Sequence, residues 1–238
     1  MVTFAFALIS WKPIEKHAAK FAFEPLDSIT NSTFKIIYDS ARLAETGLSY
    51  ALFEKAATGF YNLRSEGKAS TDKSVLSIAD FDRNSTEKRL WIIDLDRIKL
   101  ILHTWVAHGE FSGGDKASVF SNSISSCKSS LGFYITGETY QGKHGLSLRL
   151  DGMDEGYNSN ARKRAIVVHG ADYVSQGTID VLGRLGRSQG CPAVPQHQIK
   201  TVVNAMAGKT VLFINQSNQM YTSRYLNEDA SSEVLASK

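Results

Sequence analysis

The sequence predicts a mostly β domain with a small two-helix subdomain on its N-terminal side and one or two short helices further along. Apolar residues recur with a helical period over residues 34–63. From residue 71 the pattern changes to short runs of branched and aromatic residues, with few helical stretches between them. With 238 residues, 42% of them hydrophobic, the chain can form one domain with a full core and a small appendage.

The helical subdomain is assigned to residues 32–70. Its apolar side chains recur at spacings of three and four, which places them on one helix face. These residues are Leu48, Ala51, Leu52, Ala56, Phe60 and Leu63. Gly47 separates a first helix, over about residues 32–44, from a second helix that Gly67 ends. We expect this subdomain to support the fold rather than to carry chemistry.

The mostly β part is assigned to residues 71–215. Its strand candidates are residues 75–78, 90–93, 98–106, 132–136, 147–150, 165–169 and 210–214. Residues 94–97 are predicted to form a hairpin turn. Two helices are expected later in the chain, a short one near residues 179–185 and a clearer one over residues 195–206, where Pro195 suits the first helical position.

The two ends of the chain differ from the rest. Residues 1–31 form an N-terminal extension with an apolar run at residues 4–9, which no Lys or Arg precedes. This run is either a short segment that packs on the domain or the remnant of an export signal, and both interpretations stay open. Residues 216–238 form a polar tail that we expect to fray.

Composition excludes several classes of function. The chain has 27 basic and 24 acidic residues, a net charge of +3, and no basic run, so no nucleic-acid partner is expected. No apolar stretch approaches the roughly 20 residues of a membrane-spanning helix. The two cysteines, Cys127 and Cys191, allow at most one disulfide, which excludes a small disulfide-stapled scaffold and leaves the pairing of Cys127 open.

The strongest candidate for chemistry is Cys191, which lies between Gly190 and Pro192. A sharply turning backbone there can expose the thiol, and the amides of Gly190 and Cys191 can point at a developing oxyanion. Arg184 and Arg187 supply nearby positive charge, which favours the thiolate. The alternative is a buried cysteine in a glycine-rich turn, since unpaired cysteine is often buried.

A second candidate is His169, which ends the apolar run that begins after Arg164 and is followed by Gly170. A polar residue at the end of a buried strand is well placed for a site, and imidazole titrates near neutral pH. Taken alone, His169 also fits a hydrogen-bonded core histidine. Together, a strand-end histidine and a loop cysteine fit a nucleophile and its base.

These segments resemble a known family. The order Ile-Val-Val-His-Gly followed about twenty residues later by Ser-x-Gly-Cys is similar to the L,D-transpeptidase catalytic domain, the YkuD-like fold. The run Gly-Arg-Ser-x-Gly-Cys-Pro-Ala resembles its diverged murein L,D-transpeptidase branch. Residues 107–109, 120–122, 128–134 and 142–150 also fit that branch, so the resemblance covers roughly residues 70–215.

The resemblance implies roles for individual residues. Cys191 would be the nucleophile and His169 its base, with the Gly170 carbonyl orienting the imidazole and Asp172 as the rival orienter. The oxyanion donors would be the amides of Gly190 and Cys191.

Four further residues are assigned to substrate binding. They are Arg187, Ser188, Arg149 and His144. Arg149 could instead form an ion pair with Asp151 or Glu155, and His144 could lie in a surface turn.

The chain departs from the commonest family signature at two positions. Gln189 stands where that signature has His, and Ala193 stands where it has Asn. The first change removes a second imidazole beside the thiol, and the second removes a side-chain amide. Both leave open the preference for donor and acceptor, and neither changes the nucleophile or the base.

The resemblance implies a peptidoglycan L,D-transpeptidase of the cell envelope, periplasmic or secreted, that acts on tetrapeptide stems and is a carbapenem target. Cys191 would displace the terminal D-alanine, and an amine of another stem would resolve the thioester. No cofactor is expected, and no metal, because the histidines lack a common zinc spacing. The alternatives are an L,D-carboxypeptidase or peptidase that hydrolyses the same bond, and a non-catalytic wall-binding domain.

Overall fold

The computed structural model describes residues 26–217 and 220–227. The apolar run at residues 4–9, on which the export-signal interpretation depends, lies outside these residues. Within them, no helix is both long and apolar enough to cross a membrane. The described part is an eight-stranded sheet with four α-helices, which confirms the predicted mostly β class with a small helical part near its start.

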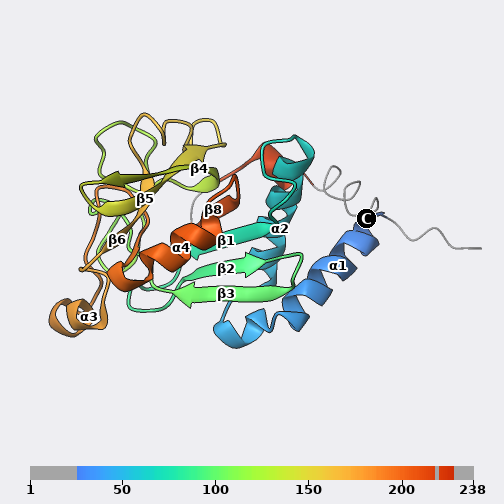
Figure 1. Cartoon of the computed structure of the whole chain (residues 1–238), viewed down its shortest axis with the longest axis horizontal. Coiled ribbons are helices and arrows are strands. Elements are labelled where there is room, and N and C mark those ends of the chain that lie inside the picture. The colour runs from blue at the N-terminus through green and yellow to red at the C-terminus, as the bar shows by residue number, and fades with distance from the viewer. Residues whose placement is uncertain (1–25, 218–219, 228–238) are drawn as a thin grey trace, which may run out of the picture.

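Two helices precede the sheet and lie together toward one end of the molecule (Figure 1). Helix α1 spans Leu26–Ser40, six residues ahead of its predicted start, and helix α2 spans Tyr50–Ser65. A short 3-10 helix, Leu43–Thr46, lies between them and ends at Gly47, whose φ of 79° suits glycine. Ser49 caps α2, because its hydroxyl accepts a hydrogen bond from the Leu52 amide at 3.3 Å.

The strands form one sheet in the order β3-β2-β1-β8-β4-β5-β6-β7. They are β1 Val75–Asp80, β2 Leu90–Asp94, β3 Lys99–Thr104, β4 Gly132–Gly142, β5 Gly145–Gly152, β6 Val167–Ala171, β7 Ala193–Pro195 and β8 Val211–Asn215. The pairs β1–β8 and β6–β7 are parallel, and the other neighbours are antiparallel. Seven of these strands fall on predicted runs. The sequence prediction missed β7.

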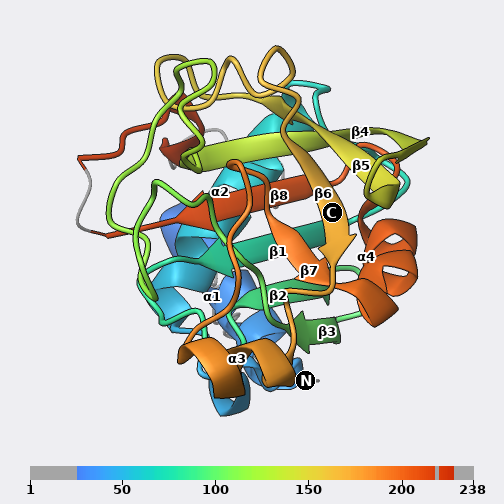
Figure 2. The ribbon, with the colours of Figure 1, turned by 90° about the vertical axis from the view of Figure 1, so that its left-hand side faces the viewer.

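The sheet curls until its two edges meet. Ala107 follows the edge strand β3, and Ala193 begins the other edge strand, β7. The Ala107 amide donates to the Ala193 carbonyl at 2.8 Å, and the Ala193 amide donates back at 3.4 Å. Figure 2 shows β6 and β7 in front of β8, β1 and β2. The result is a barrel-like sheet with an inner and an outer face.

Central strands are buried on both faces, which explains their almost continuous apolar sequences. On β1, Leu76 and Ile78 face outward and pack with α1 and α2, while Val75 and Ala79 face the interior. Strand β8 alternates in the same way. The helical subdomain therefore shares one hydrophobic cluster with the outer face of the sheet.

Two helices follow β6. Helix α3 spans Gln176–Leu182, has no buried residue and lies between the base and nucleophile candidates in sequence. Helix α4 spans Ile199–Met206 and packs Val202 and Met206 into the barrel interior. Pro195, predicted to start this helix, is instead the last residue of β7, and a short 3-10 helix, Gln196–Gln198, comes before α4.

Part of the polar tail is ordered, contrary to the expectation that it frays. Tyr225 lies in a 3-10 helix, Arg224–Leu226, and is only 3% exposed. The Asn62 side-chain amide on α2 donates to the carbonyls of Tyr225 and Asn227 at 2.8 and 2.6 Å. These bonds hold the tail against the second helix.

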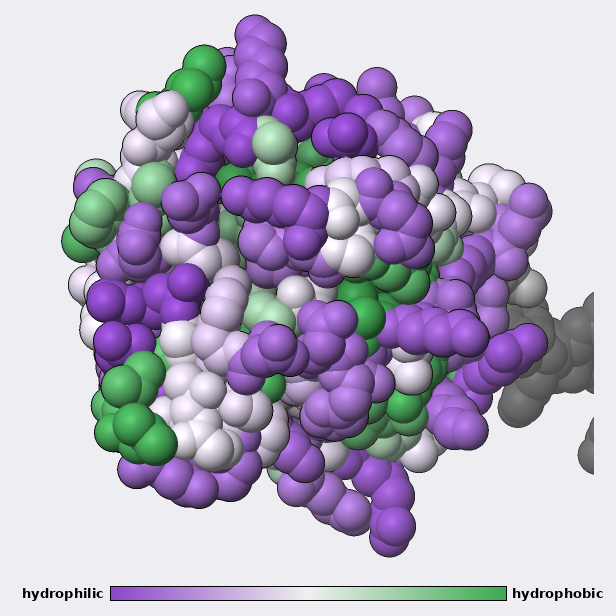
Figure 3. All heavy atoms as spheres, turned by 60° about the vertical axis from the view of Figure 1, so that its left-hand side comes forward, coloured by the Kyte–Doolittle hydropathy of each residue, from purple (hydrophilic) through white to green (hydrophobic). Residues whose placement is uncertain are grey.

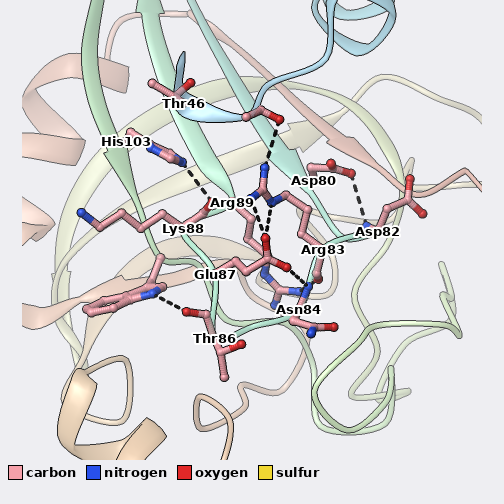
Figure 4. A network of polar contacts seen from close by, with 12 residues as sticks. Thr46, Asp80, Asp82, Arg83, Asn84, Thr86, Glu87, Lys88, Arg89 and His103 are labelled. Atoms are coloured by element: carbon pink, nitrogen blue, oxygen red, sulfur yellow. Dashed lines mark hydrogen bonds and ion pairs between the residues drawn. The ribbon is translucent and has the colours of Figure 1, made fainter. Parts of the chain in front are cut away.

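The connection between β1 and β2 is fixed by polar contacts (Figure 4). The Arg83 guanidinium donates to the Gly47 carbonyl at 3.0 Å and pairs with Glu87, which ties this connection to the helices. His103 donates to the Lys88 carbonyl at 3.0 Å from the neighbouring strand β3.

Arg89, at the end of this connection, is fully buried and forms no ion pair within the described residues, although the charges of Asp115, Asp80 and Glu87 act on it. It donates to the carbonyls of Val106 and Arg83 and to Nδ1 of His108, the last at 2.8 Å. A ring nitrogen that accepts a hydrogen bond cannot carry a proton, so His108 is neutral here. Burial, together with the charge of Arg89, lowers the pKa of His108 to about 4.

His108 therefore predicts acid sensitivity. A depressed histidine pKa means that the unfolded chain binds more protons between pH 6.5 and about 4. As the pH is lowered through this window, the free energy of unfolding should decrease. Protonation of His108 in the unfolded chain should account for about 3 kcal/mol of that decrease. Urea unfolding at several pH values measures how the free energy of unfolding depends on pH. His108→Asn should weaken this dependence, whereas His197→Asn, at an exposed position, should leave it as in the wild type. An equal slope in His108→Asn and the wild type would contradict the assignment.

Candidate active site

A cavity of about 820 Å³ opens on the side of the molecule where β5 and β6 lie. Figure 3 looks onto this side, where the surface is mostly hydrophilic with small apolar groups between. Both Cys191 and His169 line the cavity. Its other lining residues are Glu110, Ile124, Ser125, Cys127, Tyr140, Gly142, Lys143, His144, Lys163, Arg164, Ala165, Val167, Tyr173, Arg187, Ser188 and Gln189. We call this space the Cys191 cavity.

His169 is held by the sheet and by its neighbour in sequence. It lies on β6, where it pairs with Ser147 of β5 and Ala193 of β7, and it is 2% exposed. Its Nδ1–H donates to the Gly170 carbonyl at 2.9 Å. Because a carbonyl only accepts, this bond places the proton on Nδ1 and leaves Nε2 with a free lone pair in the neutral ring.

Gly170 has a packing reason to be glycine. A Cβ at this position would lie 2.5 Å from Oε1 of Gln196 and 3.1 Å from Cβ of Ile199. A side chain at this position would have to displace the flexible end of Gln196 and would press against Ile199, so the segment that leads into α4 favours glycine here.

The turn before Cys191 is closed by Ser188. The Ser188 hydroxyl donates to the Cys191 carbonyl at 2.6 Å and accepts from the Gly190 amide at 3.1 Å. The Ser188 amide donates to the His108 carbonyl at 2.9 Å. Ser188, predicted to bind substrate, lines the Cys191 cavity, but its hydroxyl is used in the hydrogen bonds that shape the turn before Cys191.

Gly190, expected to be an oxyanion donor, is fixed by packing against the 121–130 loop. Its φ is 113°, and a Cβ would lie 2.7 Å from the Lys128 carbonyl oxygen, so packing against the chain requires glycine. Its amide is used by Ser188. The Cys191 amide has no acceptor within the described residues. Of the two amides expected to donate to an oxyanion, only the Cys191 amide makes no hydrogen bond within the described residues.

Burial dominates the electrostatics of the pair. It raises the pKa of the Cys191 thiol and lowers the pKa of His169, so the resting pair is neutral thiol and neutral imidazole. The positive charges that act against burial at the thiol are Arg164 and Lys143. The expectation that Arg184 and Arg187 would supply this charge is therefore corrected.

Arg164 is a cavity residue that the sequence analysis did not single out. Its guanidinium donates to the carbonyls of Ser121 and Lys128 and to the hydroxyls of Ser126 and Ser130. It thus holds the 121–130 loop beside the nucleophile turn while it lines the Cys191 cavity. Its place directly before the apolar run that ends in His169 was the available signal.

His144 lies in the turn between β4 and β5 and also reaches the site. Its ring stacks on His169 with 4.4 Å between ring centroids and 23° between ring planes. After burial and the Gly170 bond, His144 is the next cause of the pKa shift of His169, and it lowers that pKa. The sequence left open whether His144 is a cleft residue or part of a surface turn. In the structure it is an exposed turn residue that also lines the Cys191 cavity.

Three other candidates take different places. Arg187 lines the cavity and donates to the carbonyls of Glu110 and Gly113 at 3.0 and 2.7 Å. Arg149 does not line the Cys191 cavity, and it pairs with Glu138 at 2.9 Å rather than with Asp151 or Glu155. Asp172, the rival orienter, is exposed and also lies outside the lining of the Cys191 cavity.

Cys127 shares the cavity with Cys191, and both thiols are free. Within the described residues, no three or more His, Cys, Asp or Glu side chains are grouped to hold a metal ion.

The fold and site define a class of protein in which a histidine on a strand and a cysteine in a loop line one cavity beside a barrel-like sheet. The model of the L,D-transpeptidase catalytic domain family matches residues 44–215, well over half of the chain. The chain therefore belongs to the L,D-transpeptidase catalytic domain family. No curated protein sequence matches the chain.

The chain is also similar to solved structures, at low sequence identity and low TM-score. The helical cell shape determining protein Pgp2 from Campylobacter jejuni is 12% identical, with a TM-score of 0.42 over 75% of this chain and 59% of that one. An L,D-transpeptidase from Mycobacterium smegmatis is 11% identical, with a TM-score of 0.38 over 60% of this chain and 59% of that one. The chain thus spans about three fifths of the length of these proteins.

The geometry predicts separate effects for the two stacked histidines on alkylation of Cys191, measured against pH in a Cys127→Ser background. His169→Ala removes the proton acceptor and should slow alkylation near pH 7 by about tenfold or more. His144→Ala removes a group that lowers the pKa of His169, so the inflection due to His169 should move to higher pH.

The exposed His197→Ala is the matched control and should leave the profile unchanged. Slower alkylation in His144→Ala with a normal profile in His169→Ala would reverse the two assignments.

Proposed function

We propose that the protein is a peptidoglycan L,D-transpeptidase in which Cys191 is the nucleophile and His169 its general base. The observation that carries this proposal is the fixed tautomer of His169. With Nδ1–H bound to the Gly170 carbonyl, the Nε2 lone pair is left to take a proton inside the cavity that Cys191 also lines. Family membership supplies the reaction class.

The first half-reaction follows from this arrangement. His169 Nε2 takes the thiol proton as the sulfur attacks the carbonyl carbon of the third residue of a tetrapeptide stem. The bond to the terminal D-alanine nitrogen breaks, and His169 returns the proton to that nitrogen. The products are D-alanine and a thioester on Cys191. The free Cys191 amide is placed to stabilise the oxyanion.

In the second half-reaction an amine of another stem attacks the thioester and forms a cross-link. Water attacking the same carbon would make the protein an L,D-carboxypeptidase, which is the second candidate function. The same thiol is the expected site of acylation by a carbapenem, because a strained β-lactam carbonyl resembles the acyl donor. No cofactor enters either step, since thiol and imidazole supply nucleophile, base and acid.

The charge of the Cys191 cavity supports an anionic peptide as donor. Lys143, Lys163, Arg164 and Arg187 all line it, and the carboxylates of a stem peptide would meet favourable charge there. Because peptidoglycan lies outside the cytoplasmic membrane, we place the protein in the cell envelope, periplasmic or secreted.

Incubation with purified disaccharide-tetrapeptide tests the proposal. The wild type should release D-alanine and yield cross-linked dimers, while tripeptides alone would indicate the carboxypeptidase and no change a wall-binding role. Cys191→Ser should lower D-alanine release about 1000-fold or more, because a hydroxyl is far harder to ionise than a thiol. Cys127→Ser should keep most of the activity.

If Cys127→Ser abolished D-alanine release and Cys191→Ser did not, the site assignment would be wrong. Peptide mapping after carbapenem treatment gives an independent check, with the adduct expected on the peptide that contains Cys191. An adduct on the Cys127 peptide would contradict the proposal.

A further inference from the structure

One acidic side chain stands out in the Cys191 cavity. Among the lining residues, four are cationic and only Glu110 carries a carboxylate. A carboxylate that shares a cavity with lysine and arginine often pairs with one of them. Glu110 forms no ion pair within residues 26–217 and 220–227.

The neighbour that the Glu110 carboxylate does contact is weakly polar. It interacts with the Cys127 thiol and, with burial as the larger cause, raises the pKa of that thiol. A neutral thiol is a poor donor and leaves most of the acceptor capacity of a carboxylate unused. The negative charge of Glu110 therefore remains available to a ligand in the cavity.

Backbone contacts tie Glu110 to the nucleophile turn. Its amide donates to the Ser188 carbonyl at 2.8 Å, and its carbonyl accepts from the Arg187 guanidinium at 3.0 Å. Gly109, the residue before it, forms a parallel bridge with Ser188. Glu110 is thus held in register with the segment that carries Cys191, three residues beyond Ser188.

We propose that Glu110 forms the binding site for the acceptor amine. This inference rests on the proposed function and deepens it. The two halves of the reaction need opposite charges, because the donor stem ends in a carboxylate and the acceptor arrives as an ammonium. Lys143, Lys163, Arg164 and Arg187 suit the donor and repel the acceptor. Glu110 offers the ammonium a charge-assisted hydrogen bond in the cavity that Cys191 also lines.

The step balances without any further reagent. The bound ammonium gives one proton to a solvent base, and the amine nitrogen then attacks the thioester carbonyl carbon. The new C–N bond forms as the C–S bond breaks. The surplus N–H proton passes through His169 to the departing sulfur, which restores the Cys191 thiol and neutral imidazole. Without an ammonium held at Glu110, water takes the acyl group instead.

The test is the partition of products from disaccharide-tetrapeptide, measured as the ratio of cross-linked dimer to tripeptide. Glu110→Gln keeps the shape of the side chain and removes its charge, so this ratio should fall about tenfold or more. Glu110→Asp, which keeps the charge on a shorter side chain, should give an intermediate ratio. Glu155→Gln, at an exposed position outside the cavity lining, is the matched control and should keep the wild-type ratio.

A role limited to holding the Cys127 thiol would give a different result. In that case Cys127→Ala would change the ratio as much as Glu110→Gln does, and the amine site would be overturned. An unchanged ratio in Glu110→Gln, with D-alanine still released, would overturn the amine site alone. Absence of D-alanine release from the wild type would instead overturn the proposed function.

Discussion

The site depends on the pairing of one short strand. Ala193 in β7 pairs with His169 on one side and with Ala107 on the other, which closes the sheet and fixes the position of Cys191 two residues earlier. His169 and Cys191, 22 residues apart in the sequence, are therefore brought to one cavity by backbone pairing. Side-chain contacts with the carbonyls of Gly170 and Ala165 then help to hold the imidazole and the thiol.

Several polar groups near Cys191 and His169 make hydrogen bonds within the protein that fix the turn before Cys191 and the loop next to it. Ser188 and the Gly190 amide close the nucleophile turn, and Arg164 holds the adjacent loop. Burial keeps both Cys191 and His169 neutral at rest. In the proposed reaction, the thiol therefore loses its proton only as it attacks the donor, and the donor and the acceptor would bind to cavity groups of opposite charge.

Much of the fold could be predicted from the sequence, because its central strands are buried on both faces and give strong apolar runs. β7 could not, since three residues that end in Pro195 carry no strand pattern of their own and are held by pairing with His169 and Ala107. The Cys191 and His169 candidates came from local motifs. Glu110 comes from a distant loop, and only the folded chain brings it to the cavity.

The central claim is that Cys191 carries the acyl group between donor and acceptor. Acid quenching within the first turnovers on disaccharide-tetrapeptide, followed by intact-mass analysis and peptide mapping, tests it most directly. The account predicts a mass increase equal to the donor minus D-alanine, located on the Cys191 peptide and absent from Cys191→Ser. D-alanine release without any adduct on that peptide, or an adduct on the Cys127 peptide, would contradict it.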